Sequence, residues 1–158
     1  MKNYDEFHDG SLDELLIEKG TVHVFLSTEA KQLFVAVVQG VVALTAGGFK
    51  PGNIIFEVVA RRNDELTHQD IAELYGLPAG NDGEIKAQML LQEALERNLT
   101  ILEINPSYGA NCLLLAETVE LLSRPPWAER YLASVASEGG SAGSSGGSLA
   151  TPWREDGA

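Results

Sequence analysis

Within residues 1–124, helical periodicity is confined to one stretch in the second half, and β-type sequence lies on both sides of it. Before residue 62, apolar and β-branched segments are separated by glycine, proline and asparagine turn signals, and the same pattern returns after residue 98. Strands that do not alternate regularly with helices argue against a doubly wound parallel sheet. We therefore predict an α+β fold: a mostly antiparallel sheet of about four to six strands with one or two helices packed on it, plus a flexible C-terminal tail.

The predicted strands cover six segments, which are residues 12–17, 20–27, 32–45, 54–60, 99–104 and 112–122. Lys19 and Gly20 join the first two segments and indicate a hairpin. Gly40 lies inside the third segment and marks a bend or bulge. The turn-rich residues 105–111 predict a second hairpin between the last two strands.

Two helices are predicted between the β-rich halves. Thr67 followed by Asp70 resembles a capping box, and the short helix that it opens ends at Gly76. A longer helix at residues 84–97 places one apolar face toward the core, formed by Ala87, Leu90, Leu91, Ala94 and Leu95. Ile85 and Met89 form a pair on its far side. Either another part of the fold covers this pair, or it is a small contact patch.

Composition changes after Arg124 and suggests the domain organisation. Residues 1–124 are predicted to form an acidic α+β domain, and residues 125–137 a Pro/Trp-led extension with a short helix. Residues 138–148 are almost wholly Gly, Ser and Ala, which is typical of a flexible linker, native or engineered. Residues 149–158 form a short terminal peptide.

The chain is strongly acidic, with 23 Asp and Glu against 11 Lys and Arg and a net charge of −12. A surface of this sign repels a phosphate backbone, so we expect no nucleic acid partner. It favours a basic protein partner, cations or simple solubility. The acids are scattered along the sequence, which indicates an electrostatic surface more than a catalytic centre.

Neither a signal peptide nor a membrane-spanning apolar run is recognisable, so we expect a cytoplasmic location and no membrane partner. The single cysteine, Cys112, agrees with a reducing compartment, and its apolar neighbours predict a buried, inert thiol. Neither a phosphate-binding loop nor a dinucleotide fingerprint occurs, so no cofactor is predicted.

The densest group of candidate metal ligands lies near the N-terminus. His8, Asp9, Asp13 and Glu14 place an imidazole and three carboxylates within seven residues. These side chains could approach a cation, although the spacing does not ensure convergence. A loop anchored by Phe7 is the alternative interpretation.

Large aromatic residues in the last third of the chain are candidate binding anchors. Trp127, Tyr131 and Trp153 are of the types enriched at binding hot spots. A flexible tract before Trp153 would let the last segment reach its own domain or a neighbour's. A solvated terminus is the alternative.

Four short motifs carry a family resemblance that spans roughly residues 4–122. They are Phe7-His8-Asp9-Gly10, Val22-His23-Val24, Gln39-Gly40-Val41 and Pro106-Ser107-Tyr108-Gly109-Ala110. With these motifs in this order, the chain resembles small bacterial immunity-type domains. These domains are uncharacterised or neutralise polymorphic toxins. The resemblance implies binding and masking of a toxin, without catalytic residues.

The sequence is therefore compatible with two functions. The first is a non-enzymatic protein-binding domain, immunity-like, that presents carboxylates to a basic partner. The second is a small metal-dependent protein or enzyme that uses the His8, Asp9, Asp13 and Glu14 group with Tyr108.

Overall fold

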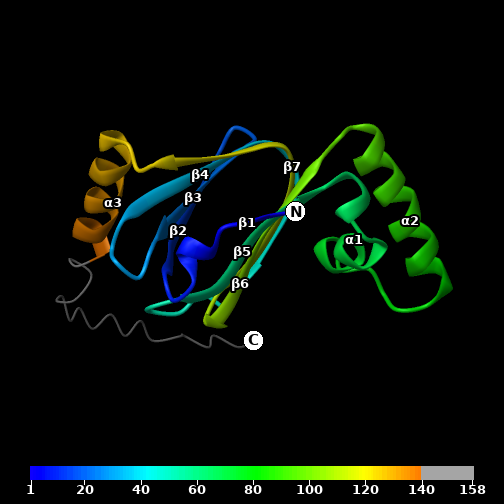
Figure 1. Cartoon of the computed structure of the whole chain (residues 1–158), viewed down its shortest axis with the longest axis horizontal. Coiled ribbons are helices and arrows are strands. Elements are labelled where there is room, and N and C mark those ends of the chain that lie inside the picture. The colour runs from blue at the N-terminus through cyan, green and yellow to red at the C-terminus, as the bar shows by residue number, and fades with distance from the viewer. Residues whose placement is uncertain (140–158) are drawn as a thin grey trace, which may run out of the picture. The chain divides into compact units, whose positions relative to one another are not determined.

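A single antiparallel sheet of seven strands organises the computed structural model, which describes residues 1–139 (Figure 1). Its strands are β1 (Lys2–Asn3), β2 (Ser11–Glu18), β3 (Thr21–Ser27), β4 (Leu33–Gly47), β5 (Ile54–Arg62), β6 (Thr100–Tyr108) and β7 (Asn111–Ser123). The α-helices are α1 (His68–Leu74), α2 (Asn81–Glu96) and α3 (Pro126–Gly139), and short 3₁₀ turns span Asp5–Phe7 and Asn63–Glu65. The α+β class and the antiparallel pairing are as predicted.

The chain divides into two units, Met1–Arg124 and Pro125–Ala158. The whole sheet, α1 and α2 belong to the first unit, and α3 belongs to the second. The first two residues of the predicted linker belong to α3. The rest of the linker and the terminal peptide, and with them the predicted flexible tail, fall in residues 140–158, which the structure does not describe.

The predicted range of four to six strands is wrong by one, because the two-residue strand β1 has no sequence signal of its own. Lys2 pairs with Ala60 and Asn3 pairs with Val59, so β1 exists only through its contact with β5. The second hairpin also differs from its prediction. Strand β6 continues to Tyr108 because β5 pairs with it through two register shifts, which leaves only Gly109 and Ala110 for the turn.

The first hairpin forms as predicted. Lys19 and Gly20 have φ angles of 48° and 80°, and Glu18 pairs with Thr21 on either side of them. Two successive positive φ angles are the geometry of the two-residue turn that matches the twist of the flanking strands. Gly40, with φ 63°, precedes a register shift between Val41 and Ala43, so the bulge predicted in the third strand is also present.

The sheet closes on itself through β5. On one side β5 pairs with β6 along its whole length, and on the other it pairs with β2 at one end and β1 at the other. The order β5-β2-β3-β4-β7-β6 therefore returns to β5. The closure is partial, because Ser11 is the one β2 residue in register with β5, so it covers only the first part of the β2 edge.

Asn53 holds the closure together at the β2 end of β5. Its buried side-chain oxygen accepts hydrogen bonds from the backbone N–H groups of Lys50 at 2.8 Å and Ala110 at 3.1 Å. Its amide nitrogen donates to the carbonyl oxygen of Leu12 at 3.2 Å. One side chain thus joins β2, the loop before β5 and the β6–β7 turn.

Two apolar clusters lie on opposite faces of the closed sheet. The interior cluster includes Phe7, Leu26, Ile104 and Leu114, together with Cys112. The exterior cluster packs α1 and α2 against the outer faces of β6 and β7, and it includes the residues Ile71, Leu74, Ala87, Leu91, Ala94, Ile101, Leu113 and Leu115. Strand alternation produces both clusters, since successive side chains of one strand point to opposite faces.

Both helices of the exterior layer follow their predictions in outline. The Thr67–Asp70 capping box is present, with the Asp70 N–H donating to the Thr67 hydroxyl at 3.2 Å. In α2 the predicted inner face is correct except for Leu95, which is exposed, whereas Gly83 takes part in the buried face. Gly83 fits because an added Cβ there would lie 1.9 Å from the Pro78 carbonyl oxygen.

Candidate functional site

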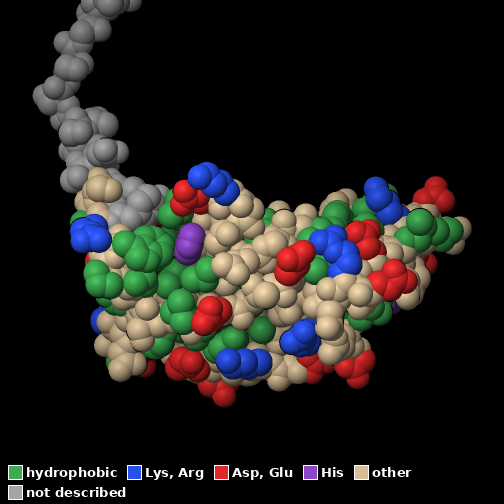
Figure 2. Space-filling model, turned by 90° about the horizontal axis from the view of Figure 1, so that it is seen from above, with side chains coloured by type: hydrophobic (Ala, Val, Ile, Leu, Met, Phe, Trp, Pro, Cys, Tyr) green, Lys and Arg blue, Asp and Glu red, His purple; other side chains and the backbone are tan. Residues whose placement is uncertain are grey.

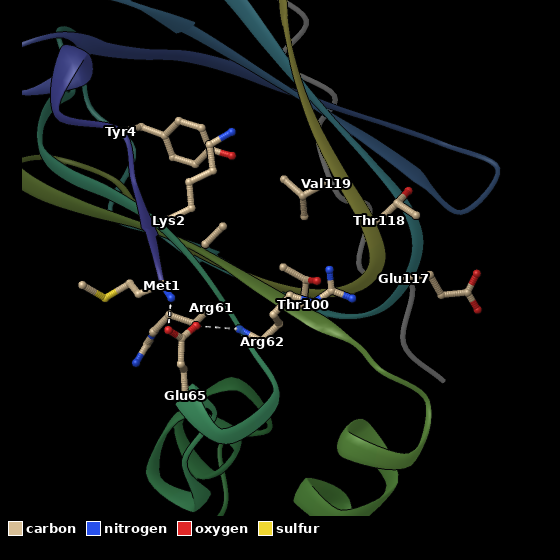
Figure 3. Close-up of a pocket in the computed structure, with 11 residues that line it drawn as sticks. Met1, Lys2, Tyr4, Arg61, Arg62, Glu65, Thr100, Glu117, Thr118 and Val119 are labelled. Atoms are coloured by element: carbon tan, nitrogen blue, oxygen red, sulfur yellow. Dashed lines mark hydrogen bonds and ion pairs between the residues drawn. The ribbon is translucent and has the colours of Figure 1, made fainter.

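A cavity of about 540 Å³ opens where β1, the last residues of β5, the first residue of β6 and the middle of β7 come together (Figure 3). We call it the mouth. It is lined by Met1, Lys2, Tyr4, Ala60, Arg61, Arg62, Glu65, Thr100, Glu117, Thr118 and Val119. Tyr4, Ala60 and Val119 also belong to or pack against the interior cluster, so the mouth opens onto the inside of the closed sheet.

Strand pairing places two cations on the interior face at this opening. Lys2 lies directly opposite Ala60, and Arg62 follows Ala60 by two residues on the same face. Thr100 lies opposite Arg62 on the other neighbouring strand. Lys2, Arg62 and Thr100 therefore share the face to which Ala60 belongs.

The two cations and the nearby carboxylates differ in their pairing. Glu65 forms an ion pair with the Met1 ammonium, and Glu117 lies 3.6 Å from a guanidinium nitrogen of Arg97. Within residues 1–139, neither Lys2 nor Arg62 has a carboxylate at ion-pair distance. The Lys2 ammonium lies 4.6 Å from the centre of the Tyr4 ring, which leaves its hydrogen-bond donors available.

Arg61 has a different role from Arg62, its neighbour in the sequence. Its guanidinium group lies 3.0 Å from Asp70 in α1 and also pairs with Glu103 in β6. The Arg61 side chain is only 18% exposed. This ion-paired cluster fastens the N-terminus of α1 to the sheet, so Arg61 is a structural residue at the edge of the mouth.

A second, smaller cavity of about 290 Å³ lies beside the first 3₁₀ turn. We call it the acidic hollow, and it is lined by Asn3, Tyr4, Asp5, His8, Phe56 and Glu57. The His8 and Phe56 ring centres are 5.5 Å apart, and Phe56 is 55% exposed. Tyr4 lines both the hollow and the mouth.

The carboxylates of the hollow carry uncompensated charge. Glu57 accepts a long 3.5 Å hydrogen bond from the Asn105 amide. In the part of the chain that the structure describes, neither Asp5 nor Glu57 has a cation at ion-pair distance. An exposed aromatic ring next to two such carboxylates is chemically suited to a cation with an apolar stem.

The predicted metal-ligand group does not converge on one point. His8 Nδ1 lies 3.1 Å from Asp9, but Asp13 is directed to the buried Arg124, 2.5 Å from its guanidinium nitrogen. Asp13 also accepts a hydrogen bond from the Ser27 hydroxyl at 3.2 Å. No group of three or more His, Cys, Asp or Glu side chains suited to a metal occurs in residues 1–139.

The predicted contact residues are exposed where the structure describes them. Ile85 and Met89 on α2 are 52% and 69% exposed, so the fold of the first unit leaves the pair uncovered. Trp127 lies in the first turn of α3 and is 40% exposed. Tyr131 also belongs to α3, but its side chain, like Trp153, lies outside the described residues.

Cys112 lies in the interior cluster, as predicted. Burial raises the pKa of its thiol from 9.0 to about 12. A thiol with this pKa is almost wholly protonated at neutral pH, and only the thiolate is a good nucleophile.

The sequence interpretation missed the residues that form the two cavities. Lys2 is 60 positions from Arg62 and Asp5 is 52 positions from Glu57, and the pairing of β1 with β5 brings each pair together. One signal was available: Phe56 and Glu57 interrupt a strand whose neighbours are aliphatic. A polar residue in such a strand indicates that this part of the strand faces outward.

Figure 2 shows acidic side chains spread over the visible face instead of gathered in one patch, with basic and hydrophobic side chains between them. No helix in residues 1–139 is long and apolar enough to cross a membrane. Comparison of the chain with protein-family models, with curated proteins and with solved structures finds no match.

Proposed function

We propose that this chain is a non-enzymatic protein-binding domain that receives a basic side chain of its partner in the acidic hollow. The observation that carries the proposal is the exposed Phe56 ring beside Asp5 and Glu57, two carboxylates without a cation in the described residues. The hollow combines apolar contact area with charge of one sign. Lysine and arginine side chains have the complementary design, with an apolar stem and a cationic head.

Arginine fits this hollow better than lysine. A guanidinium group is planar, stacks on aromatic rings and donates several hydrogen bonds to carboxylates. The volume of about 290 Å³ is at the lower limit of the range typical of small-molecule sites, about 300–1,000 Å³. It therefore suits one side chain of a larger partner.

Aromatic rings elsewhere in this protein already form cation–π contacts with Lys and Arg side chains. Lys50 lies 5.0 Å from the centre of the Tyr108 ring, and the Arg124 guanidinium lies 5.5 Å from that of Phe25. Phe56 has its exposed ring available for the same contact. An intermolecular cation would complete a type of interaction that the fold uses internally.

The surface next to the hollow adds apolar contact area. Ile54 and Phe56 lie two residues apart on β5, and Tyr108 lies opposite Ile54 on β6. All three side chains are exposed. We call them the outer strip. An aromatic and aliphatic strip with an acidic recess at its end is a suitable surface for a basic protein segment.

The net charge contributes at longer range. A charge of −12 spread over the surface attracts basic proteins and raises association rates, and this effect weakens as salt increases. Immunity-like masking of a basic toxin is the form of this function that the sequence resemblance implies. The metal-dependent alternative would require Asp13 to leave Arg124, so the geometry favours it less.

The proposal is tested by NMR titration of the full chain with a short acetylated arginine peptide and with the same peptide carrying citrulline. Backbone amide shifts are expected at residues 3–8 and 56–57 with the arginine peptide only. The double variant Asp5→Asn/Glu57→Gln should weaken this binding about tenfold or more, because charge-assisted hydrogen bonds are lost.

Glu120→Gln is the matched control, since it removes an exposed carboxylate outside the hollow. It should leave the binding constant within about twofold of the unmodified chain. Equal binding of the citrulline peptide, or shifts that map away from the hollow, would show that the proposed site is wrong.

A further inference from the structure

We infer that the mouth is a second binding site, for a small organic anion that carries an apolar body. Lys2 and Arg62 hold its carboxylate or phosphate group, and Tyr4, Ala60 and Val119 contact its body. This site goes beyond the proposed protein-binding function. It uses a different cavity and a ligand of opposite charge.

The charge distribution supports an anion at this opening. Only 11 of the 158 residues are Lys or Arg, yet Lys2 and Arg62 both lie here without a carboxylate partner in the described residues. The two carboxylates at the mouth, Glu65 and Glu117, already have cationic partners. The charge left unpaired is therefore positive, in a chain whose net charge is −12.

The register of β1 and β5 places the two cations on one face of the mouth, where the Lys2 ammonium lies over the Tyr4 ring and the Arg62 side chain is directed toward Thr100 (Figure 3). Lys2 lies opposite Ala60, so Lys2 and Arg62 are diagonal neighbours on one face. Diagonal neighbours in an antiparallel pair are about 7–8 Å apart at the backbone, which long side chains can bridge. A carboxylate or phosphate between them would receive hydrogen bonds from both.

The walls of the mouth supply the remaining contacts of a binding site. Tyr4 and Val119 offer apolar surface at the edge of the interior cluster, and Thr100 offers a hydroxyl group. A volume of about 540 Å³ falls within the range of about 300–1,000 Å³ that small-molecule sites occupy. Such sites combine apolar walls with polar groups that fix orientation. Polar and charged residues predominate in the lining of the mouth, and the apolar wall is formed by Met1, Tyr4, Ala60 and Val119.

The test is an NMR titration of the full chain with 4-phenylbutyrate and phenyl phosphate, and with 4-phenylbutanol and inorganic phosphate as controls. Saturable amide shifts are expected at residues 2–4, 60–62, 100 and 117–119 with either organic anion. Their relative affinities show which anionic group the mouth prefers. The neutral alcohol lacks the charge and inorganic phosphate lacks the body, so each should bind at least about tenfold more weakly.

Variants assign the effect to the two cations. Lys2→Gln/Arg62→Gln should weaken binding of the better organic anion about tenfold or more, and Arg62→Lys should retain part of the affinity. Lys86→Gln removes an exposed lysine of α2 outside the mouth and should leave affinity within about twofold. Thermal unfolding verifies that each variant is folded.

Several outcomes would overturn the inference. Equal binding of 4-phenylbutanol would exclude recognition of charge, and equal binding of inorganic phosphate would exclude a role for the apolar wall. An unchanged affinity in the double variant would exclude Lys2 and Arg62. The Glu57→Gln variant of the acidic hollow should bind the organic anion as the unmodified chain does, so this test can fail independently of the proposed protein binding.

Discussion

The mouth and the acidic hollow are built from the same short N-terminal segment, yet they present opposite charges. Lys2 and Tyr4 line the mouth, whereas Asn3, Tyr4 and Asp5 line the hollow. Because neighbouring residues of an extended segment point to opposite faces, a few residues can serve two sites. The net charge of −12 therefore does not predict the local charge of either cavity, since within residues 1–139 the mouth carries unpaired cations and the hollow carries unpaired carboxylates.

Both the mouth and the acidic hollow depend on closure of the sheet, and a substitution at Asn53 tests this dependence. Replacing Asn53 with Ala leaves buried backbone groups of Leu12 and Ala110 without their hydrogen bonds. We expect urea unfolding to show a loss of about 2–4 kcal/mol, and binding of both probes to weaken. Asn111→Ala, an exposed position on β7, is the control and should stay within about 0.5 kcal/mol. A stable Asn53→Ala variant would show that closure does not depend on this side chain.

Removing a buried structural charge should lower stability, whereas removing a charge of either cavity should lower binding. The Arg124 side chain is 5% exposed, and it contacts Asp13 and the Leu26 carbonyl oxygen. Arg124→Gln should lower the free energy of unfolding by roughly 2–3 kcal/mol, because it leaves Asp13 without its cation.

The expected pattern is a loss of stability without a selective loss of either binding activity in the folded protein. Arg62→Gln, by contrast, should change stability by about 0.5 kcal/mol or less and affect anion binding. Chemical denaturation of both variants measures the difference. Similar stability losses in the two would remove the distinction between structural and binding charges.

Tyr4 is the residue that the two cavities share, and its substitution should affect both. Tyr4→Leu removes the ring over which the Lys2 ammonium lies and is expected to cost roughly 1 kcal/mol of stability. Affinity for the arginine peptide and for the organic anion should both fall. Tyr4→Phe keeps the ring and should retain most of each. A selective loss at one cavity would show that Tyr4 belongs functionally to that cavity alone.

The smallest effect is expected for chemical labelling of Cys112, which measures how far a reagent enters the interior of the sheet. Its thiol should not react with a disulfide reagent at pH 8 in the folded protein, because it is buried and its pKa is raised to about 12. Rapid labelling, followed by absorbance, would show that solvent and reagent reach Cys112 through the interior of the closed sheet. Denatured protein should react at once and serves as the positive control.

The same thiol makes stability depend on pH in the alkaline range. The folded state holds the Cys112 proton more tightly than the unfolded state, whose thiol titrates near 9.0. Its contribution is therefore complete below pH 9 and is lost as pH rises toward 12. In Cys112→Ala the loss of stability over this range should be smaller, with the remainder including Tyr75, whose pKa burial also raises.

Local features of this chain could be predicted because neighbouring residues decide them. The positive φ angles at Lys19 and Gly20 suit a tight hairpin, and Thr67 and Asp70 cap α1 through contacts three residues apart. The apolar surroundings of Cys112 likewise predicted its burial. Each of these outcomes depends on short-range sterics, hydrogen bonding or hydrophobic pattern.

The sequence by itself determined the α+β class, the antiparallel strands, the first hairpin turn and most of the inner face of α2. Only the tertiary structure decided that the sheet closes, that β1 exists and that Asp13 pairs with Arg124 instead of with His8 and Asp9. Only the structure brought Lys2 to Arg62 and Asp5 to Glu57. The physical reason is that closure and both cavities depend on the register between strands about 50 residues apart, which no local propensity encodes.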